Sequence, residues 1–458
     1  MSEECTATEA NMSRIPSPEL RVISSHQVSP PPGTVGDSTL PLTYLDLFWL
    51  GAGSVERVFF YPLAVSASHF VHSVVPSLES SLSVALRNFY PLAGKIRHSA
   101  ARADGYELHY ADGDSVLFTV AEYSGGDFDY LSSDHPRLFN DLLPLLPELP
   151  QSSTDGDGLR LLAVQATLFP ERGVAIGITV HHAACDGSST IRFVSAWATA
   201  CAGAGVAPPP LIDRSMISDP DDLYSFFYNE IVKGESVQTM LHQKAPADAV
   251  LETFTIGKEQ IQKLKGLVTQ SGDLSFRCST LVVAFAYVWV CHVKARLPES
   301  NDKLVIMGFT GDLRARLKPP IPAPYFGNCL GAAFTATKAG ELTKENAVVA
   351  AARLIGEAIE TFKEKPFKDL EEWPELMKTL GEADILSVAG SPTFKVYDVD
   401  FGWGRPKKVE ITSVAKTGAM AVAESREEEG GVEIGLVKPK AEMAMFEKHF
   451  NAGLKTMP

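Results

Sequence analysis

Two adjacent histidines, His181 and His182, follow an apolar run from Gly173 to Val180 and precede the pair Asp186-Gly187. The run predicts a buried strand, and Asp-Gly predicts a turn. Beyond the turn, apolar residues recur at helical spacing: Ile191, Val194, Trp197 and Ala198. A histidine at a strand end can be presented to a cleft, where its near-neutral pKa suits general-base catalysis. The His-x-x-x-Asp spacing is short, so the rest of the chain has to support this chemistry.

The composition bounds the class of protein. The chain has 458 residues, 45% hydrophobic and 21% charged, which fits two or three globular domains. A net charge of −15 disfavours nucleic-acid binding, and the apolar runs are too short to span a membrane. The cysteines are scattered along the sequence, which predicts reduced thiols and no metal site. The first residues are acidic and lack the apolar region of a signal peptide, so none is expected. We therefore expect a cytoplasmic protein without nucleic-acid or membrane partners, and we expect a monomer.

The order of the expected elements predicts an α/β protein whose sheets are covered by helices. Residues 1–18 are polar and predicted to be disordered, and residues 19–200 form the first expected domain. Its elements are a strand at 20–28, a helix at 76–89, a pair of strands at 106–110 and 116–121, and a hairpin of 161–169 with 174–180. A Gly-, Ala- and Pro-rich stretch then opens a crossover linker at 201–246.

The second domain is expected at 247–458. Its predicted strands lie at 250–256, 305–310, 330–336 and 384–390, with a hairpin of 419–424 and 432–437. A helix at 281–293 is apolar on nearly all sides, so we expect it to be buried. Ser279 is a suitable N-cap for this helix. The free amides near Ser279 and Thr280 can alternatively hold a phosphate, helped by Arg277.

Two further segments have the residue types of a ligand pocket. Segment 40–47 carries large apolar groups around Thr43, and it is either a buried connection or one wall of an acceptor pocket. Gly402 and Gly404 flank Trp403, so the backbone can approach a neighbour closely on each side of a large ring.

The segment His182-Ala183-Ala184-Cys185-Asp186, followed much later by Asp400-Phe401-Gly402-Trp403-Gly404, resembles the paired motifs of the plant BAHD acyl-CoA-dependent acyltransferases. The pair in this order is far more specific than either motif alone. Tyr325-Phe326-Gly327-Asn328-Cys329 is similar to the signature of the branch that acts on anthocyanins and other phenolic glucosides. Segments 40–47, 90–95 and 387–391 also resemble that branch, so the likeness covers nearly the whole chain.

The resemblance implies two chloramphenicol-acetyltransferase-like layered α/β domains with a channel between them, entered by acyl-CoA from one face and by the acceptor from the other. It implies that His182 is the catalytic base. Asp186 is implied to pair with an arginine, for which Arg314 is the candidate, although a role in orienting His182 stays open.

The second motif is implied to be structural support near the CoA channel, as is Gly187 beside the first. Trp403 and Gly404 belong to this support, and Trp403 is also a candidate for lining the acyl pocket. A catalytic role for Asp400 stays open.

The residue chemistry agrees with acyl transfer from a thioester to an alcohol. One histidine can take the proton from the attacking hydroxyl and then return it to the leaving thiolate. A thioester is already activated, so no nucleophilic side chain is required. A nucleophilic Cys185 and a direct role for His181 are the lesser alternatives.

The expected function is transfer of malonyl, or a related acyl group, from CoA as a co-substrate to a sugar hydroxyl of a phenolic or flavonoid glucoside. A free malonyl carboxylate needs a cation, and Arg277 is the candidate. Arg405 replaces the lysine that we associate with malonyl-using members, which leaves the donor open. The alternatives are a hydroxycinnamoyl-CoA-dependent enzyme, a non-catalytic protein that retains the fold, and a thioesterase in which water reaches His182.

Overall fold

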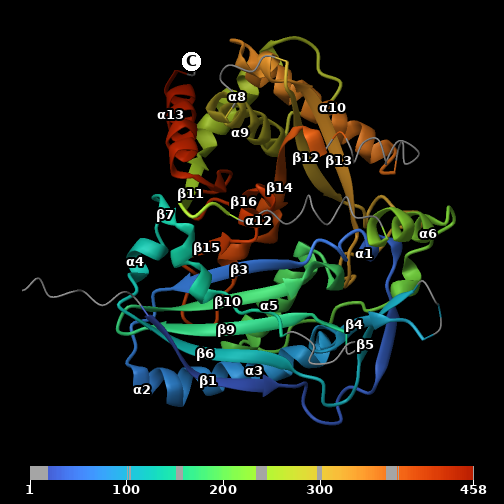
Figure 1. Cartoon of the computed structure of the whole chain (residues 1–458), viewed down its shortest axis with the longest axis vertical. Coiled ribbons are helices and arrows are strands. Elements are labelled where there is room, and N and C mark those ends of the chain that lie inside the picture. Colours follow the sequence, from blue (N-terminus) through green and yellow to red (C-terminus); the bar gives the residue numbers. More distant parts are fainter. Residues whose placement is uncertain are drawn as a thin grey trace, which may run out of the picture.

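A computed structural model describes residues 19–100, 102, 105–150, 158–233, 245–296, 302–367, 379 and 381–456. The predicted disorder at 1–18 lies outside these residues, as does part of the expected crossover linker. The described residues form two stacked α/β units, with the first half of the chain in the lower one in Figure 1 and most of the second half above it.

The lower unit is built on a sheet of six described strands in the order β1-β6-β9-β10-β3-β15. These are β1 (Glu19–Val28), β3 (Ser54–Tyr61), β6 (Val116–Ser124), β9 (Leu162–Phe169), β10 (Gly173–His181) and β15 (Lys408–Ile411). Every residue of β9 and β10 is buried, because side chains pack on both faces of the sheet. The predicted hairpin is confirmed, with Gly173 opposite Phe169.

The predicted pairing of segments 106–110 and 116–121 is wrong, although both are strands. β5 (Tyr106–Tyr110) belongs to a smaller sheet with β2 (Ser38–Pro41), β4 (Lys95–His98) and β8 (Leu159–Arg160). β6 instead lies between β1 and β9. A short connection suggested a hairpin, but the apolar side chains of β6 are buried only in the larger sheet, so packing decided the partner.

The upper unit is built on a sheet of seven described strands in the order β13-β12-β14-β16-β17-β11-β7. They are β7 (Arg137–Leu138), β11 (Ala249–Ile256), β12 (Leu304–Asp312), β13 (Leu330–Lys338), β14 (Asp384–Gly390), β16 (Met420–Glu424) and β17 (Val432–Pro439). Each large sheet takes a strand from the other half of the chain, because β15 pairs with β3 and β7 pairs with β11. A buried ion pair of 2.8 Å, Arg137 to Glu410, joins these two exchanged strands.

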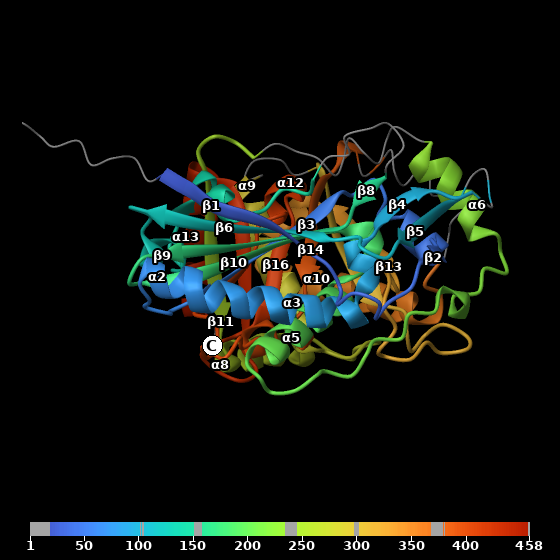
Figure 2. The same ribbon diagram turned by 90° about the horizontal axis from the view of Figure 1, so that it is seen from below.

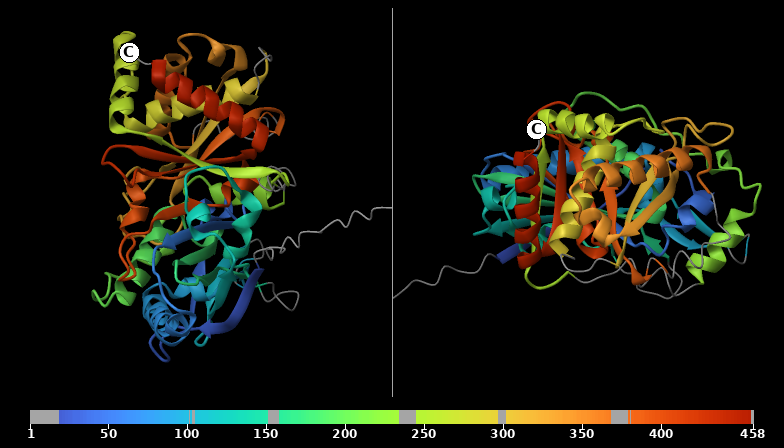
Figure 3. Two further views of the ribbon diagram at one scale, coloured as in Figure 1. Left: turned by 90° about the vertical axis from the view of Figure 1, so that its left-hand side faces the viewer. Right: turned by 90° about the horizontal axis from the view of Figure 1, so that it is seen from above.

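Helices cover the outer faces of both large sheets, as the perpendicular views in Figures 2 and 3 show. The longer ones in the lower unit are α3 (Val75–Asn88) and α5 (Gly187–Cys201). In the upper unit they are α8 (Lys258–Gln270), α9 (Thr280–Arg296), α10 (Ala347–Glu364) and α13 (Lys440–Thr456). As predicted, α9 is buried along nearly its whole length. The short helices α1 (Tyr44–Leu47), α2 (Ala67–His69), α4 (Phe128–Leu131), α6 (Leu223–Phe227) and α12 (Val414–Thr417) lie in connections.

No helix among the described residues is long and apolar enough to cross a membrane.

Candidate active site

The strand β10 ends at the two histidines and gives them different surroundings. The side chain of His181 is buried, and its Nδ1 accepts a hydrogen bond of 3.3 Å from the backbone N–H of Ala183. Burial, with a smaller effect from His182, lowers the pKa of His181 to about 4. His181 therefore packs in the core as a neutral ring, which agrees with the packing role that the sequence favoured over a direct one.

The backbone of His182 is held from both sides. Its N–H donates to the carbonyl of Gly53 at 2.8 Å, and its carbonyl accepts from the side-chain amide of Asn328 at 2.9 Å. The imidazole stacks on the indole of Trp49, with ring centroids 3.9 Å apart and an angle of 8° between the rings. Burial lowers the pKa of His182, and the nearby Asp186 offsets this only in part. The ring is therefore neutral near pH 7 and able to accept a proton.

His182 and Trp49 line a cavity of about 1460 Å³ between the two units. Residues from the lower sheet and from α5 form one wall, and residues from β12, β14 and α12 form the other. Neither the Nδ1 of His182 nor the indole Nε1 of Trp49 has a hydrogen-bond partner among the described residues, although both are buried. The cavity is thus lined by a neutral base, while these two nitrogens are covered by protein.

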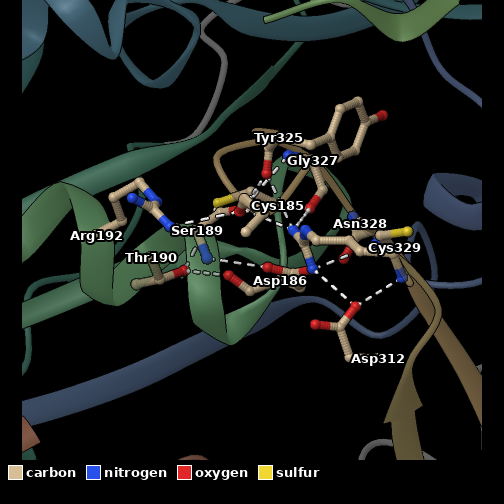
Figure 4. Close-up of polar contacts among 12 residues, drawn as sticks. Cys185, Asp186, Ser189, Thr190, Arg192, Asp312, Tyr325, Gly327, Asn328 and Cys329 are labelled. Carbon is tan, nitrogen blue, oxygen red and sulfur yellow. Dashed lines mark hydrogen bonds and ion pairs between the residues drawn. The ribbon is translucent and has the colours of Figure 1, made fainter. Parts of the chain in front are cut away.

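Asp186 faces away from this base and is fully engaged elsewhere. One carboxylate oxygen accepts from the backbone N–H of Ser189 at 2.9 Å, which caps α5. The other accepts from the backbone N–H of Cys329 at 3.2 Å and lies 2.8 Å from Arg314 Nη1. Figure 4 shows Asp186 at the centre of these contacts. The expected ion pair with Arg314 is therefore present, and the contacts of Asp186 support α5 and the 325–329 loop.

Gly187 follows as the first residue of α5. A side chain here would place its Cβ 2.8 Å from the ring of Phe394, which belongs to the upper unit. Only glycine allows the two units to meet this closely beside the base.

A second buried network, which sequence reasoning missed, holds the histidine loop from the other side. The carboxylate of Asp46 is fully buried and accepts from Arg214 Nη1 at 3.1 Å and from Asn328 Nδ2 at 3.0 Å. Arg214 Nη2 also donates to the carbonyl of Ala184 at 3.0 Å. The available signal was an acid in an otherwise apolar segment, because a buried carboxylate requires a cation.

Thr43 belongs to this network rather than to a pocket wall. Its backbone N–H and its hydroxyl donate to Asp46 at 2.9 and 2.8 Å, and it does not line the cavity. The neighbouring Phe48 and Trp49 do line it. Of the two roles predicted for segment 40–47, the structure therefore shows the buried connection. The cavity wall is formed by Phe48 and Trp49, just after the segment.

The loop of Asp400 lies outside the cavity. One oxygen of its carboxylate accepts from the backbone N–H groups of Gly402, Trp403 and Gly404 at 2.7, 2.9 and 2.9 Å. Both glycines have positive φ, 93° and 87°, which side chains rarely adopt. Trp403 packs edge-on against Tyr61 with centroids 5.4 Å apart. These contacts make Asp400 an organiser of a tight loop, and the structure brings neither Asp400 nor Trp403 to the base.

The residues expected to bind CoA are not in the cavity wall either. The Oγ of Ser279 caps α9 by accepting from the N–H of Val282 at 3.3 Å, and the hydroxyl of Thr280 accepts from Lys265 Nζ at 3.1 Å. Arg277 is exposed, and none of the three lines the cavity. The cations that do line it are Arg57, Arg192, Arg296, Lys303, Arg314, Lys416 and Lys438.

Cys185 is buried and unsuited to nucleophilic attack. Burial raises the pKa of its thiol to about 12, so the thiolate is scarce near neutral pH. The described residues contain no cluster of His, Cys, Asp or Glu that could hold a metal ion.

A neutral histidine in a cavity shared by two α/β units, without an activated nucleophile, is an arrangement suited to general-base catalysis. The sequence matches the model of the Transferase family over residues 19–453, so the chain belongs to this family, that of the BAHD acyltransferases. The protein is an acyltransferase.

Curated relatives and a solved structure agree with this family assignment. The chain is 38% identical to phenolic glucoside malonyltransferase 1 of Nicotiana tabacum, with 86% of this chain and 89% of that protein aligned. It is 34% identical to coumaroyl-CoA:anthocyanidin 3-O-glucoside-6''-O-coumaroyltransferase 1 of Arabidopsis thaliana, over 95% of this chain and 97% of that one. The crystal structure of vinorine synthase matches with a TM-score of 0.68 at 23% identity, over 93% of this chain and 96% of that one. This likeness confirms the expected fold.

Proposed function

We propose that the protein transfers malonyl, or a related acyl group, from acyl-CoA to a sugar hydroxyl of a phenolic or flavonoid glucoside. One observation carries this proposal: the neutral His182 lies in a large cavity between the two units, while Asp186 is occupied by Arg314. The names of the relatives support the choice of donor and acceptor. The absence of a thiolate nucleophile beside the base favours direct transfer in a ternary complex over a covalent acyl-enzyme.

The mechanism follows from this arrangement. His182 removes the proton of the sugar hydroxyl as its oxygen attacks the thioester carbonyl. The attack forms a tetrahedral intermediate that carries a negative oxygen. Collapse breaks the C–S bond, and the protonated His182 returns its proton to the CoA thiolate. The ester and free CoA then leave, and the base is neutral again.

The overall reaction can be tested with a panel of acyl-CoAs and phenolic glucosides. We expect a product heavier than its glucoside by one acyl group, with His182→Ala giving almost none. Release of CoA without acylated glucoside would identify a thioesterase instead. Binding of both substrates without turnover would identify a non-catalytic protein that retains the fold.

The state of His182 predicts how turnover depends on pH. Burial lowers the pKa of the ring below its ordinary value of 6.5, and a general base works only when deprotonated. We therefore expect kcat/KM to rise with pH through a midpoint below 6.5 and then to level off. A profile from about pH 5 to pH 8 measures this limb. A midpoint above the ordinary histidine value would contradict the assigned state of the base.

The cellular setting is part of the same proposal. We place the protein in the cytoplasm as a monomer, without a nucleic-acid partner. The five cysteines that the structure describes are all free thiols, which supports a reducing compartment.

A further inference from the structure

One cavity-lining cation, Arg57, is buried without an acidic partner. Its side chain lies on β3 and is only 4% exposed. Within the described part of the chain it makes no ion pair, and its Nε has no hydrogen-bond partner. A buried guanidinium normally requires a carboxylate or phosphate, since an unpaired buried charge is costly. An anion in the cavity would give this charge the partner that the described residues lack.

Three other cations of the cavity are already paired with acids. Arg314 pairs with Asp186 at 2.8 Å, and Lys438 pairs with Glu442 at 2.5 Å. Lys416 pairs with Glu56 and is also partly exposed. Arg57 thus differs from each of them in having burial without a partner.

Glu424 is the acid whose charge acts on Arg57. Burial lowers the pKa of Arg57 to about 10, and Glu424 offsets this only in part. One oxygen of Glu424 accepts a hydrogen bond from the backbone N–H of Tyr397 at 3.0 Å. The side chains of Glu424 and Arg57 form no ion pair with each other. Burial also raises the pKa of Glu424, so this acid is a poor counter-ion.

The strand register places Arg57 opposite Ile178 of β10, which lies four residues before His182. Ser54 lies opposite His181 in the β3–β10 ladder, and Arg57 is three residues further along β3. This separation is about 10 Å at the rise of an extended strand. Val55 and Arg57 share one face of β3, and both line the cavity that contains His182. Arg57 also lines a second cavity of only about 20 Å³, enough for one water molecule.

We infer that Arg57 binds the free carboxylate of a dicarboxylic acyl donor and so selects malonyl-CoA over neutral acyl-CoAs. This inference rests on the proposed acyl transfer. A malonyl carboxylate lies two bonds beyond the thioester carbonyl, and a guanidinium can hold it by two parallel hydrogen bonds. The expected candidate for this task, Arg277, is exposed and outside the cavity.

The test compares malonyl-CoA with acetyl-CoA, which differs by the carboxylate alone. Arg57→Gln should lower kcat/KM for malonyl-CoA by about 10- to 100-fold while leaving acetyl-CoA nearly unchanged. Arg57→Lys should give a kcat/KM for malonyl-CoA between those of the wild type and of Arg57→Gln, because lysine keeps the charge but loses the paired hydrogen bonds. Equal losses with both donors, or no loss with either, would overturn the inference.

A measurement on the unaltered enzyme covers the case in which these variants do not fold. The amide analogue of malonyl-CoA has the same shape without the charge, and we expect it to react about 10- to 100-fold less well than malonyl-CoA. Equal use of the two, or exclusive use of a neutral donor such as coumaroyl-CoA, would overturn the role of Arg57 while leaving acyl transfer intact. Failure of the proposed function itself would be recognised by an absence of transfer from every donor.

Discussion

His182→Ala is expected to lower turnover by about 10²–10⁴-fold, the range associated with general acid–base catalysis. The alanine removes the group that takes the hydroxyl proton and returns it to the thiolate. The fold should survive, because the backbone N–H and carbonyl of His182 make its hydrogen bonds, to Gly53 and Asn328, and these remain when only the stacking on Trp49 is lost. Steady-state kinetics with a malonyl donor, together with thermal melting, measure the two effects separately.

Cys185→Ala is the matched control, because this residue lies in the same motif and lines the same cavity. Its thiol has a raised pKa and no part in the mechanism, so we expect turnover to change far less than in His182→Ala. A Cys185 variant as damaged as the His182 variant, with both proteins folded, would point to a covalent acyl-enzyme instead.

Asp186→Asn is expected to lower the free energy of unfolding by about 3–5 kcal/mol, the cost of leaving one member of a buried ion pair unpaired. Arg314 is only 4% exposed, and it would keep its charge after losing the carboxylate at 2.8 Å. The loop from Tyr325 to Cys329 would also lose the hydrogen bond that the N–H of Cys329 donates to the Asp186 carboxylate. Chemical denaturation of the wild type and the variant gives this difference directly.

Asp312→Asn provides the comparison, because Asp312 also contacts Arg314, at 3.3 Å, but its side chain is 56% exposed. An exposed ion pair contributes at most about 1 kcal/mol, so this variant should be nearly as stable as the wild type. If Asp186→Asn instead left stability unchanged and reduced only kcat, a role in orienting His182 would be favoured.

The sequence alone determined the family and most of the secondary structure, and it singled out His182 as the candidate base. The buried strand β10, the turn at Asp186 and the helix α5 follow from local periodicity and turn residues, and they are where they were predicted. The motifs from His182 to Asp186 and from Asp400 to Gly404 identified the family, because their order along the chain is specific. These features depend on neighbouring residues, which a sequence displays directly.

Only the tertiary structure decided which distant residues meet. Asp46 and Arg214 are 168 residues apart, and no local pattern indicates that they would share a buried ion pair beside the histidine loop. The pairing of β6 with β9 likewise depended on which sheet could bury its apolar side chains.

The same reason separates Arg57 from Arg277. Arg277 is a candidate for binding an anion because it precedes the start of a helix. Arg57 lies within a strand whose sequence has no feature that indicates a binding site. Whether an arginine is solvated or buried without a partner depends on the packing of both units around it. Burial and counter-ions are properties of the assembled fold, and they decide which charge is left for a substrate.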